Sequence, residues 1–121
     1  MKNPFKGTHS GAITFTAAEA IPANTPVKFN GSGQIVKAAA ATDVAIGSTI
    51  DGATGAGDIV AVAVFGAHPG TVAVIAGAGG MTQGSAVTPI GTKATTGLTI
   101  GIALSDADAG KVFELAHKPA V

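Results

Sequence analysis

The sequence predicts an all-β protein, a compact β-barrel or β-sandwich with two similar lobes, short strands and glycine-rich turns. Its 121 residues include 11 Val, 10 Ile and 14 Thr, the β-branched residues that pack well on a pleated sheet. Eighteen Gly and six Pro interrupt the chain every few residues, a spacing that helices tolerate badly. Apolar residues come in short segments between these breaks, as strands require.

The first half of the chain contains a sequence of short predicted strands. Residues 13–16 alternate between apolar and polar side chains, and residues 27–29 place two apolar side chains on one face. The turn at 30–33 has the sequence Asn-Gly-Ser-Gly, which favours a hairpin returning through 34–37. Residues 44–47 form another apolar segment, followed by a glycine-rich loop at 52–58.

The second half of the chain likewise contains short apolar segments separated by turns. Apolar segments at 59–65 and 71–76 flank a turn at 66–70, and further strands are expected at 85–90, 98–104 and 111–115. A Thr-rich turn at 91–97 and a loop at 105–110 separate the last three strands.

The strands at 59–65 and 71–76 are apolar on both faces, although an antiparallel sheet normally keeps one face polar. One interpretation is that they form a subunit interface. The valines on the two strands are the candidate residues, namely Val60, Val62, Val64, Val72 and Val74. The alternative is a central strand covered on both sides by loops of the same chain.

A weak internal repeat supports the two lobes. In the first half, Pro26-Val27 leads to Ile46-Gly47 and then to Ala56-Gly57-Asp58-Ile59-Val60. In the second half, Ala86-Val87 leads to Ile100-Gly101 and then to Ala109-Gly110-Lys111-Val112-Phe113. No linker separates the two copies, so we expect a single β domain over 12–121, preceded by an extended N-terminal arm at 1–11.

Composition disfavours several classes of function. There is no cysteine, which excludes disulfide and thiolate chemistry. Seven lysines balance seven carboxylates without any arginine, so direct recognition of nucleic acid is not expected. Trp and Tyr are absent, which argues against stacking platforms for bases or sugars. No apolar run reaches the length of about 20 residues that a membrane-spanning helix needs, and no signal peptide is evident, so we expect synthesis in the cytoplasm and no membrane partner.

Short motifs suggest chemistry only weakly. Ser10 follows His9 in sequence, but adjacency says nothing about catalytic geometry. The glycines around 79–85 lack the lysine of a phosphate-binding loop. Lys93 lies near a possible hairpin tip, as a lipoyl or biotinyl carrier lysine would, without the flanking residues that mark such carriers.

Metal binding has equally little support in the sequence. His9, His68 and His117 lie far apart in the chain. The segment 106–110 begins like a calcium loop, but the later ligands are missing. We therefore predict a protein that is not an enzyme, with no catalytic residues, no metal site and no cofactor.

The ordered motifs resemble one known family. They are Ala-Glu-Ala-Ile-Pro-Ala-Asn-Thr-Pro-Val-Lys, a Gly-Ser-Gly turn, Ala-Ala-Thr-Asp-Val-Ala-Ile-Gly, Gly-Ala-Gly-Asp-Ile-Val-Ala-Val, and a late Ile-Gly-Ile-Ala-Leu with Ala-Gly-Lys-Val. Over 12–115 the chain is similar to the small capsid cement, or decoration, proteins of tailed bacteriophages. The resemblance implies a β-rich structural protein, commonly trimeric, on the outer surface of the mature head. Such proteins sit where capsomers meet and stabilise the shell against internal DNA pressure.

This resemblance gives the N-terminal arm an expected use. The arm becomes a candidate capsid-binding segment that adds a strand to a sheet edge of the major capsid protein. Phe5 would anchor it, Lys2 and Lys6 would meet acidic capsid residues, and Asn3 and Pro4 complete the segment. A terminus without this role is the alternative. For the whole protein, the rival hypothesis is a ligand-binding module on the head surface for host or glycan attachment, and an enzyme ranks third.

Overall fold

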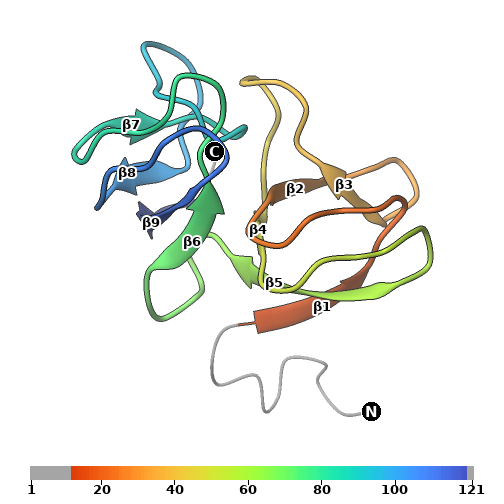
Figure 1. The fold of residues 1–121 in the computed structure, drawn as a ribbon. Coiled ribbons are helices and arrows are strands. Elements are labelled where there is room, and N and C mark those ends of the chain that lie inside the picture. The colour runs from red at the N-terminus through yellow and green to blue at the C-terminus, as the bar shows by residue number, and fades with distance from the viewer. Residues whose placement is uncertain (1–11, 120–121) are drawn as a thin grey trace.

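The structure, a computed structural model, describes residues 12–119 and contains only β-strands, turns and loops within that range (Figure 1). The all-β prediction is therefore confirmed. Nine strands follow one another along the chain: β1 (Ala12–Thr16), β2 (Pro26–Phe29), β3 (Ile35–Lys37), β4 (Gly47–Thr49), β5 (Ile59–Val64), β6 (Val72–Ile75), β7 (Ala86–Val87), β8 (Gly101–Ala103) and β9 (Val112–His117).

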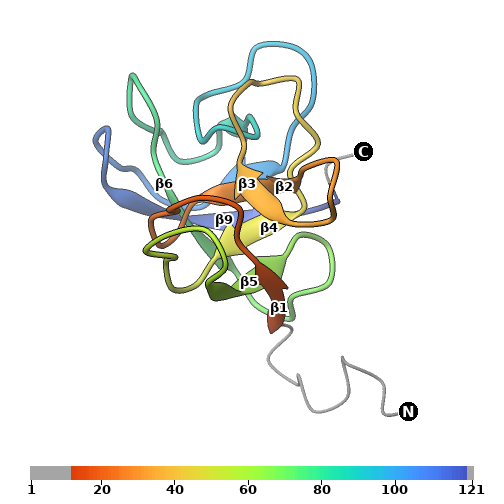
Figure 2. The ribbon, with the colours of Figure 1, turned by 90° about the vertical axis from the view of Figure 1, so that its right-hand side faces the viewer.

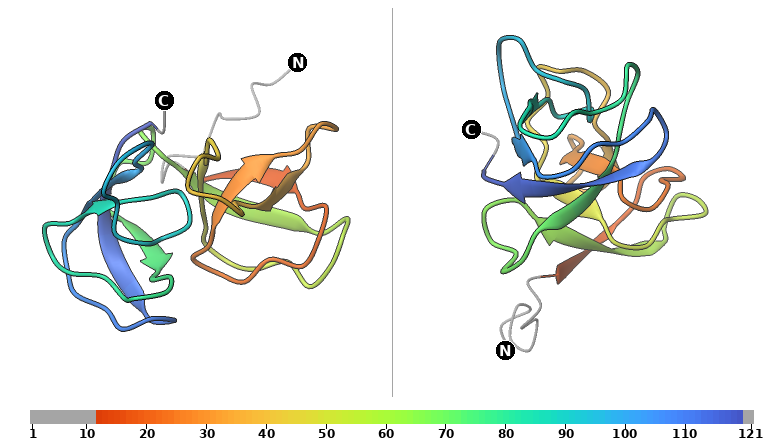
Figure 3. Two further views of the ribbon diagram at one scale, coloured as in Figure 1. Left: turned by 90° about the horizontal axis from the view of Figure 1, so that it is seen from above. Right: turned by 60° about the vertical axis from the view of Figure 1, so that its left-hand side comes forward.

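The strands form two antiparallel sheets, one in each half of the chain. The first has the order β1-β5-β4-β2-β3 and the second the order β6-β9-β8-β7. We call residues 12–65 the first lobe and residues 71–118 the second lobe; they lie side by side, joined by residues 66–70 (Figures 1 and 3). Figure 2 shows the first lobe in front, with β6 and β9 behind it.

The two lobes repeat the same pairing, strand for strand. Strands β1, β5, β4 and β2 correspond in order to β6, β9, β8 and β7. The registers also correspond: Phe15↔Val60 matches Val74↔Phe113, Val27↔Gly47 matches Val87↔Gly101, and Ser48↔Ala63 matches Ile102↔Ala116. Strand β3 has only an isolated bridge at Lys93 as its counterpart. The weak repeat in the sequence therefore reflects a duplicated structural unit.

The glycine of each Ile-Gly motif is required by a close approach between strands. A Cβ on Gly47 would collide with the backbone carbonyl of Ala63, and a Cβ on Gly101 would collide with that of Ala116. Ala63 and Ala116 are equivalent residues of β5 and β9. Both lobes therefore need glycine at this point of the sheet for the same steric reason.

Each lobe has its own hydrophobic core, and the second core extends across the lobe boundary. The first core contains Ile21, Val27 and Ile35 among its buried residues. The second is built around Phe113 and Leu115 and also takes in three residues of the first lobe. These are Ala45, Ala63 and Phe65. The shared core packs the two lobes against each other.

The doubly apolar strands differ from their predicted role. β5 and β6 belong to different sheets, so residues 66–70 connect two lobes and do not close a hairpin. Val60 and Val62 are buried in the first core, and Val72 and Val74 in the second. The opposite face of β5 is apolar partly because Ala63 lies in the shared core. Both faces of β5 are thus covered within one chain near Ala63, whereas Ile59 at the start of the strand is exposed.

Two predicted strands have different bounds in the structure. The strand predicted at 44–47 is displaced: β4 begins at Gly47 and ends at Thr49, and residues 44–46 precede it. The strand expected at 85–90 is limited to β7, because a tight turn follows, in which the Gly91 N–H donates to the Thr88 carbonyl at 3.0 Å. Across residues 12–119 no helix is long and apolar enough to cross a membrane.

Candidate functional site

The predicted contact residues fall into two groups. The arm residues Lys2, Asn3, Pro4, Phe5 and Lys6 lie outside the described residues. The interface valines lie inside the molecule: Val60, Val62 and Val74 are fully buried, Val72 is almost so, and Val64 packs against the first core. Because the chain itself covers Val60, Val62, Val72 and Val74, these four have no surface to offer another subunit, and the interface interpretation does not hold for them; Val64 is partly buried.

Among the described residues, five of the seven exposed large apolar side chains lie on the outer faces of the two sheets; the other two are Phe29 and Val44. Ile59 is 63% exposed at the start of β5, and Ile102 is 52% exposed on β8. Further exposed apolar side chains on these faces are Ile50, Leu104 and Val112. We call these five residues the outer-face residues. Isolated exposed apolar side chains are common on proteins, but an apolar set on one face of a sheet indicates a contact surface.

The outer-face residues recur at equivalent positions. The Ile50 N–H donates to the Ala61 carbonyl at 2.9 Å, and the Leu104 N–H donates to the Glu114 carbonyl at 2.8 Å, so Ile50 and Leu104 correspond. Ile59 and Val112 correspond through their pairing with the edge strands β1 and β6. Two positions of the duplicated unit therefore carry an exposed apolar side chain in both lobes: Ile50 and Leu104 at one, Ile59 and Val112 at the other.

A shallow hollow of about 450 Å³ lies beside Ile102 on the second lobe. It is lined by Ala86, Thr99, Gly101, Ile102, Ala116 and Lys118. Apart from the Thr99 hydroxyl and the Lys118 amine, its side chains are apolar. The hollow offers apolar contact area with one positive charge at its edge.

The connection between the lobes is held by a histidine that follows the last predicted strand, 111–115. His117 ends β9. Its Nδ1 accepts a hydrogen bond from the Gly66 N–H at 2.8 Å, and its Nε2 lies 2.8 Å from the Gly70 carbonyl. Because a carbonyl only accepts, Nε2 is the donor of this second hydrogen bond, while Nδ1 accepts from Gly66. No short-range signal reveals this role, since His117 lies about 50 residues from its partners.

His68 lies next to this connection. Its ring centroid is 6.1 Å from that of His117, and its buried Nδ1 has no hydrogen-bond partner among the described residues. Burial, and secondarily the neighbouring His117, lowers the pKa of His68 below its ordinary value of 6.5. Protonation of His68 is therefore disfavoured in the folded protein.

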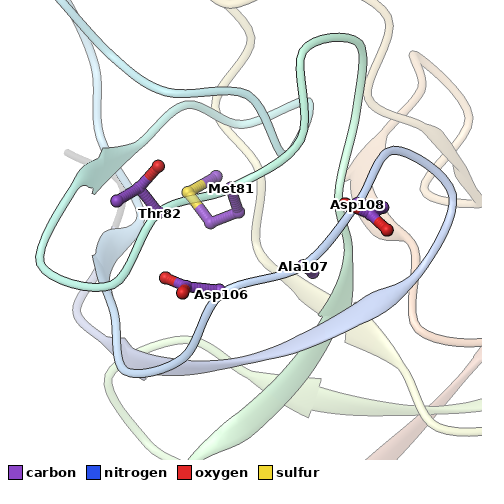
Figure 4. Close-up of a pocket in the computed structure, with 5 residues that line it drawn as sticks. All are labelled: Met81, Thr82, Asp106, Ala107 and Asp108. Atoms are coloured by element: carbon purple, nitrogen blue, oxygen red, sulfur yellow. The ribbon is translucent and has the colours of Figure 1, made fainter.

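The acidic loop at 105–110 holds backbone groups in place. Figure 4 shows Asp106 and Asp108 on one segment, separated by Ala107, with Met81 and Thr82 facing Asp106 across a shallow pocket. The Asp106 carboxylate accepts a hydrogen bond from the Gln83 N–H at 2.7 Å. Within residues 12–119 no three His, Cys, Asp or Glu side chains gather as a metal site would require. The loop therefore has an explained structural role.

Two other aspartates have the same type of role in the first lobe. Asp43 accepts hydrogen bonds from the N–H groups of Ala39 and Ala40 and pairs with Lys28 at 3.0 Å. These contacts lower the pKa of Asp43, the Ala39 hydrogen bond most of all. The Thr54 hydroxyl and N–H likewise lower the pKa of Asp58. Both carboxylates fix turns, a common role of aspartates in loops.

No protein-family model matches the chain, and no curated protein matches it significantly.

Proposed function

We propose that this protein is a capsid decoration protein, which binds the outer surface of a mature tailed-phage head and stabilises the shell against internal DNA pressure. In this proposal it acts as a homotrimer where capsomers meet, its partner is the major capsid protein, and its role is mechanical, without catalysis. The protein is made in the host cytoplasm and resides in the virion.

One observation carries the proposal: the outer-face residues recur at equivalent positions in the two lobes. Ile50 and Ile59 in the first lobe have exposed apolar counterparts in Leu104 and Val112. A duplicated unit that keeps apolar side chains exposed in both copies presents repeated contact surface. Such surface suits a protein that joins several neighbours through many modest contacts, because linked contacts gain avidity from effective concentration.

The resemblance to cement proteins provides the second support. Its Ile-Gly and Ala-Gly motifs have a structural reason in this chain, since Gly47 and Gly101 permit the close strand approach, and Gly57 and Gly110 adopt positive φ. The motifs that suggest the family are therefore those that build the duplicated fold.

The proposal is tested on mature, expanded heads that lack decoration, prepared from the phage that encodes this chain. Purified protein is added to saturation, and release of packaged DNA is followed during heating and during treatment with chelator. We expect release to require a higher temperature and a longer chelator treatment than in undecorated heads. Unchanged release at saturating protein would refute the proposal, and binding of glycans by the free protein would favour the rival ligand-binding module.

A further inference from the structure

We propose that copies of this chain associate head to tail, so that the outer face of the second lobe of one copy receives the first lobe of the next. This inference concerns contacts between copies and does not depend on binding to a capsid. It rests on comparing the same sheet face in the two lobes: the face with Ser48 and Ala63 in the first lobe, and the face with Ile102 and Ala116 in the second.

In the first lobe one end of this face is covered by the second lobe, while Ile50 and Ile59 stay exposed. Ala45, Ala63 and Phe65 belong to the shared core. Ser48, beside them on β4, is only 1% exposed, and its hydroxyl donates a hydrogen bond to the Ala73 carbonyl of β6 at 2.9 Å. The first lobe therefore uses this face as a docking surface for the next unit along the chain.

In the second lobe the equivalent face is open. Strand pairing places Ile102 at the position of Ser48 and Ala116 at the position of Ala63. Continuing the same register, Thr99 corresponds to Ala45 and Lys118 to Phe65. These four residues line the hollow described above. Ile102 is 52% exposed where its counterpart is buried. The hollow is therefore the second-lobe counterpart of the surface that the second lobe covers on the first lobe, and nothing among the described residues of the chain covers it.

The repeat also identifies the occupant. The unit that covers the first lobe docks through its edge strand β6, where the Ile75 N–H donates to the Asn24 carbonyl at 2.8 Å. The equivalent edge strand is β1, with Thr14 and Thr16 at the positions of Ala73 and Ile75. β1 is the outer strand of its sheet, and an outer strand has backbone groups available for pairing. Beyond Thr16 this edge is taken, since Ala17 bridges to Ile35.

The acceptor side of this contact is open as well. Gly84 is the counterpart of Asn24, since the N–H groups of Asn24 and Gly84 donate to the equivalent carbonyls of Thr49 and Ala103. Both residues have positive φ. No hydrogen bond to the Gly84 carbonyl occurs among the described residues. In the assembly, this carbonyl accepts a hydrogen bond from the Thr16 N–H of the next copy.

A contact between two different surfaces is heterologous, and it forms a closed ring when the rotation between copies permits closure. The formal net charge of the chain is zero, so copies do not repel one another strongly at neutral pH. A ring of three copies is the form that the proposed trimer requires.

Cysteine cross-linking tests the contact directly, because the chain has no cysteine of its own. The variant Thr14→Cys with Ile102→Cys is treated with a short bismaleimide and analysed by denaturing gel and mass spectrometry. Ile50→Cys with Ala73→Cys is the positive control, since both residues line a hollow between the two lobes of one chain and neither is fully buried. We expect intermolecular multimers from the first pair and an intramolecular bridge from the control. Thr14→Cys and Ile102→Cys alone are expected to stay uncross-linked.

Two results would overturn the inference. Cross-linking of Ile102→Cys alone would show that like faces meet, as in a two-fold dimer. A control pair that closes while the Thr14/Ile102 pair does not would show that the copies do not dock in this way.

Light scattering gives an independent test. We expect the unmodified protein to be oligomeric and Ile102→Asp to have at least a two-fold lower molar mass. Ile59→Asp should keep the oligomer, because its counterpart Val112 stays 44% exposed beside the inter-lobe contact. Far-UV circular dichroism verifies that both variants fold. A monomeric unmodified protein across the accessible concentration range would contradict the inference.

Discussion

Gly101 provides the sharpest test of the duplicated fold. An alanine Cβ at this position would lie 2.9 Å from both the carbonyl carbon of Ala116 and the Cα of His117, and closer still to the Ala116 oxygen. These neighbours are backbone atoms of β9, which cannot move without disturbing two strand pairs. Gly101 also has φ of 149°, a value that side chains other than glycine rarely adopt.

The cost of Gly101→Ala combines these two effects. Overpacking against rigid neighbours costs about 1–3 kcal/mol, and an unfavourable backbone conformation costs about 1–3 kcal/mol. We therefore expect the free energy of unfolding to fall by about 2–6 kcal/mol. A domain of this length has a total stability of roughly 6–18 kcal/mol, so the variant should fold but denature much more readily.

Urea denaturation followed by far-UV circular dichroism measures this loss, since the chain has no tryptophan to report by fluorescence. With a urea dependence of about 1–3 kcal/mol/M, the midpoint should fall by at least about 0.7 M. Gly47→Ala should also destabilise, though less, because its clash is similar while its φ is not positive. Gly55→Ala is the matched control, since nothing lies near its Cβ position. A Gly101→Ala variant as stable as that control would refute the steric account.

Three further predictions concern the core, the lobe connection and the arm. Phe113→Ala, at a position 1% exposed in the second core, should cost about 3–5 kcal/mol, whereas Phe29→Ala at 47% exposure should cost clearly less; urea midpoints compare the two, and equal losses would contradict the assigned core. Because the pKa of His68 is lowered in the folded state, the unfolded state binds more protons, so the free energy of unfolding should decrease as pH falls below about 6.5. His68→Gln should reduce that decrease between pH 7.5 and 5.0, and an unchanged pH dependence would show that other groups cause it. Deleting residues 1–11 should leave the circular dichroism spectrum of the β domain intact while weakening sedimentation with heads at least ten-fold, and undiminished binding would remove the arm from the capsid contact.

The sequence was informative where local patterns determine structure. Alternating apolar residues predict β1, and the Asn30 turn predicts the β2–β3 hairpin, in which the Asn30 carboxamide accepts hydrogen bonds from the Ser32 and Gln34 N–H groups. The Ile-Gly and Ala-Gly repeat predicts two similar lobes because glycine is needed at the same close approach in each. These features depend on neighbouring residues or on steric rules that act residue by residue.

Long-range packing was not predictable from the same patterns. Ile59 and Ala63 share a face of β5, yet Ile59 is exposed and Ala63 is buried, because the second lobe covers only one end of that strand. An apolar face therefore did not reveal which part would be free. The valines of β5 and β6 suggested an interface for the same reason: strands from two cores within one chain resemble strands shared between chains. His117 was missed because its partners, Gly66 and Gly70, are distant in sequence.

Electron cryo-microscopy of expanded heads, with and without added protein, tests the central proposal most directly. The account predicts extra density on the outer surface where capsomers meet, into which copies of the two-lobed chain fit with the second lobe of each against the first lobe of the next. Decorated and undecorated heads with identical outer surfaces at saturating protein would contradict the proposed function.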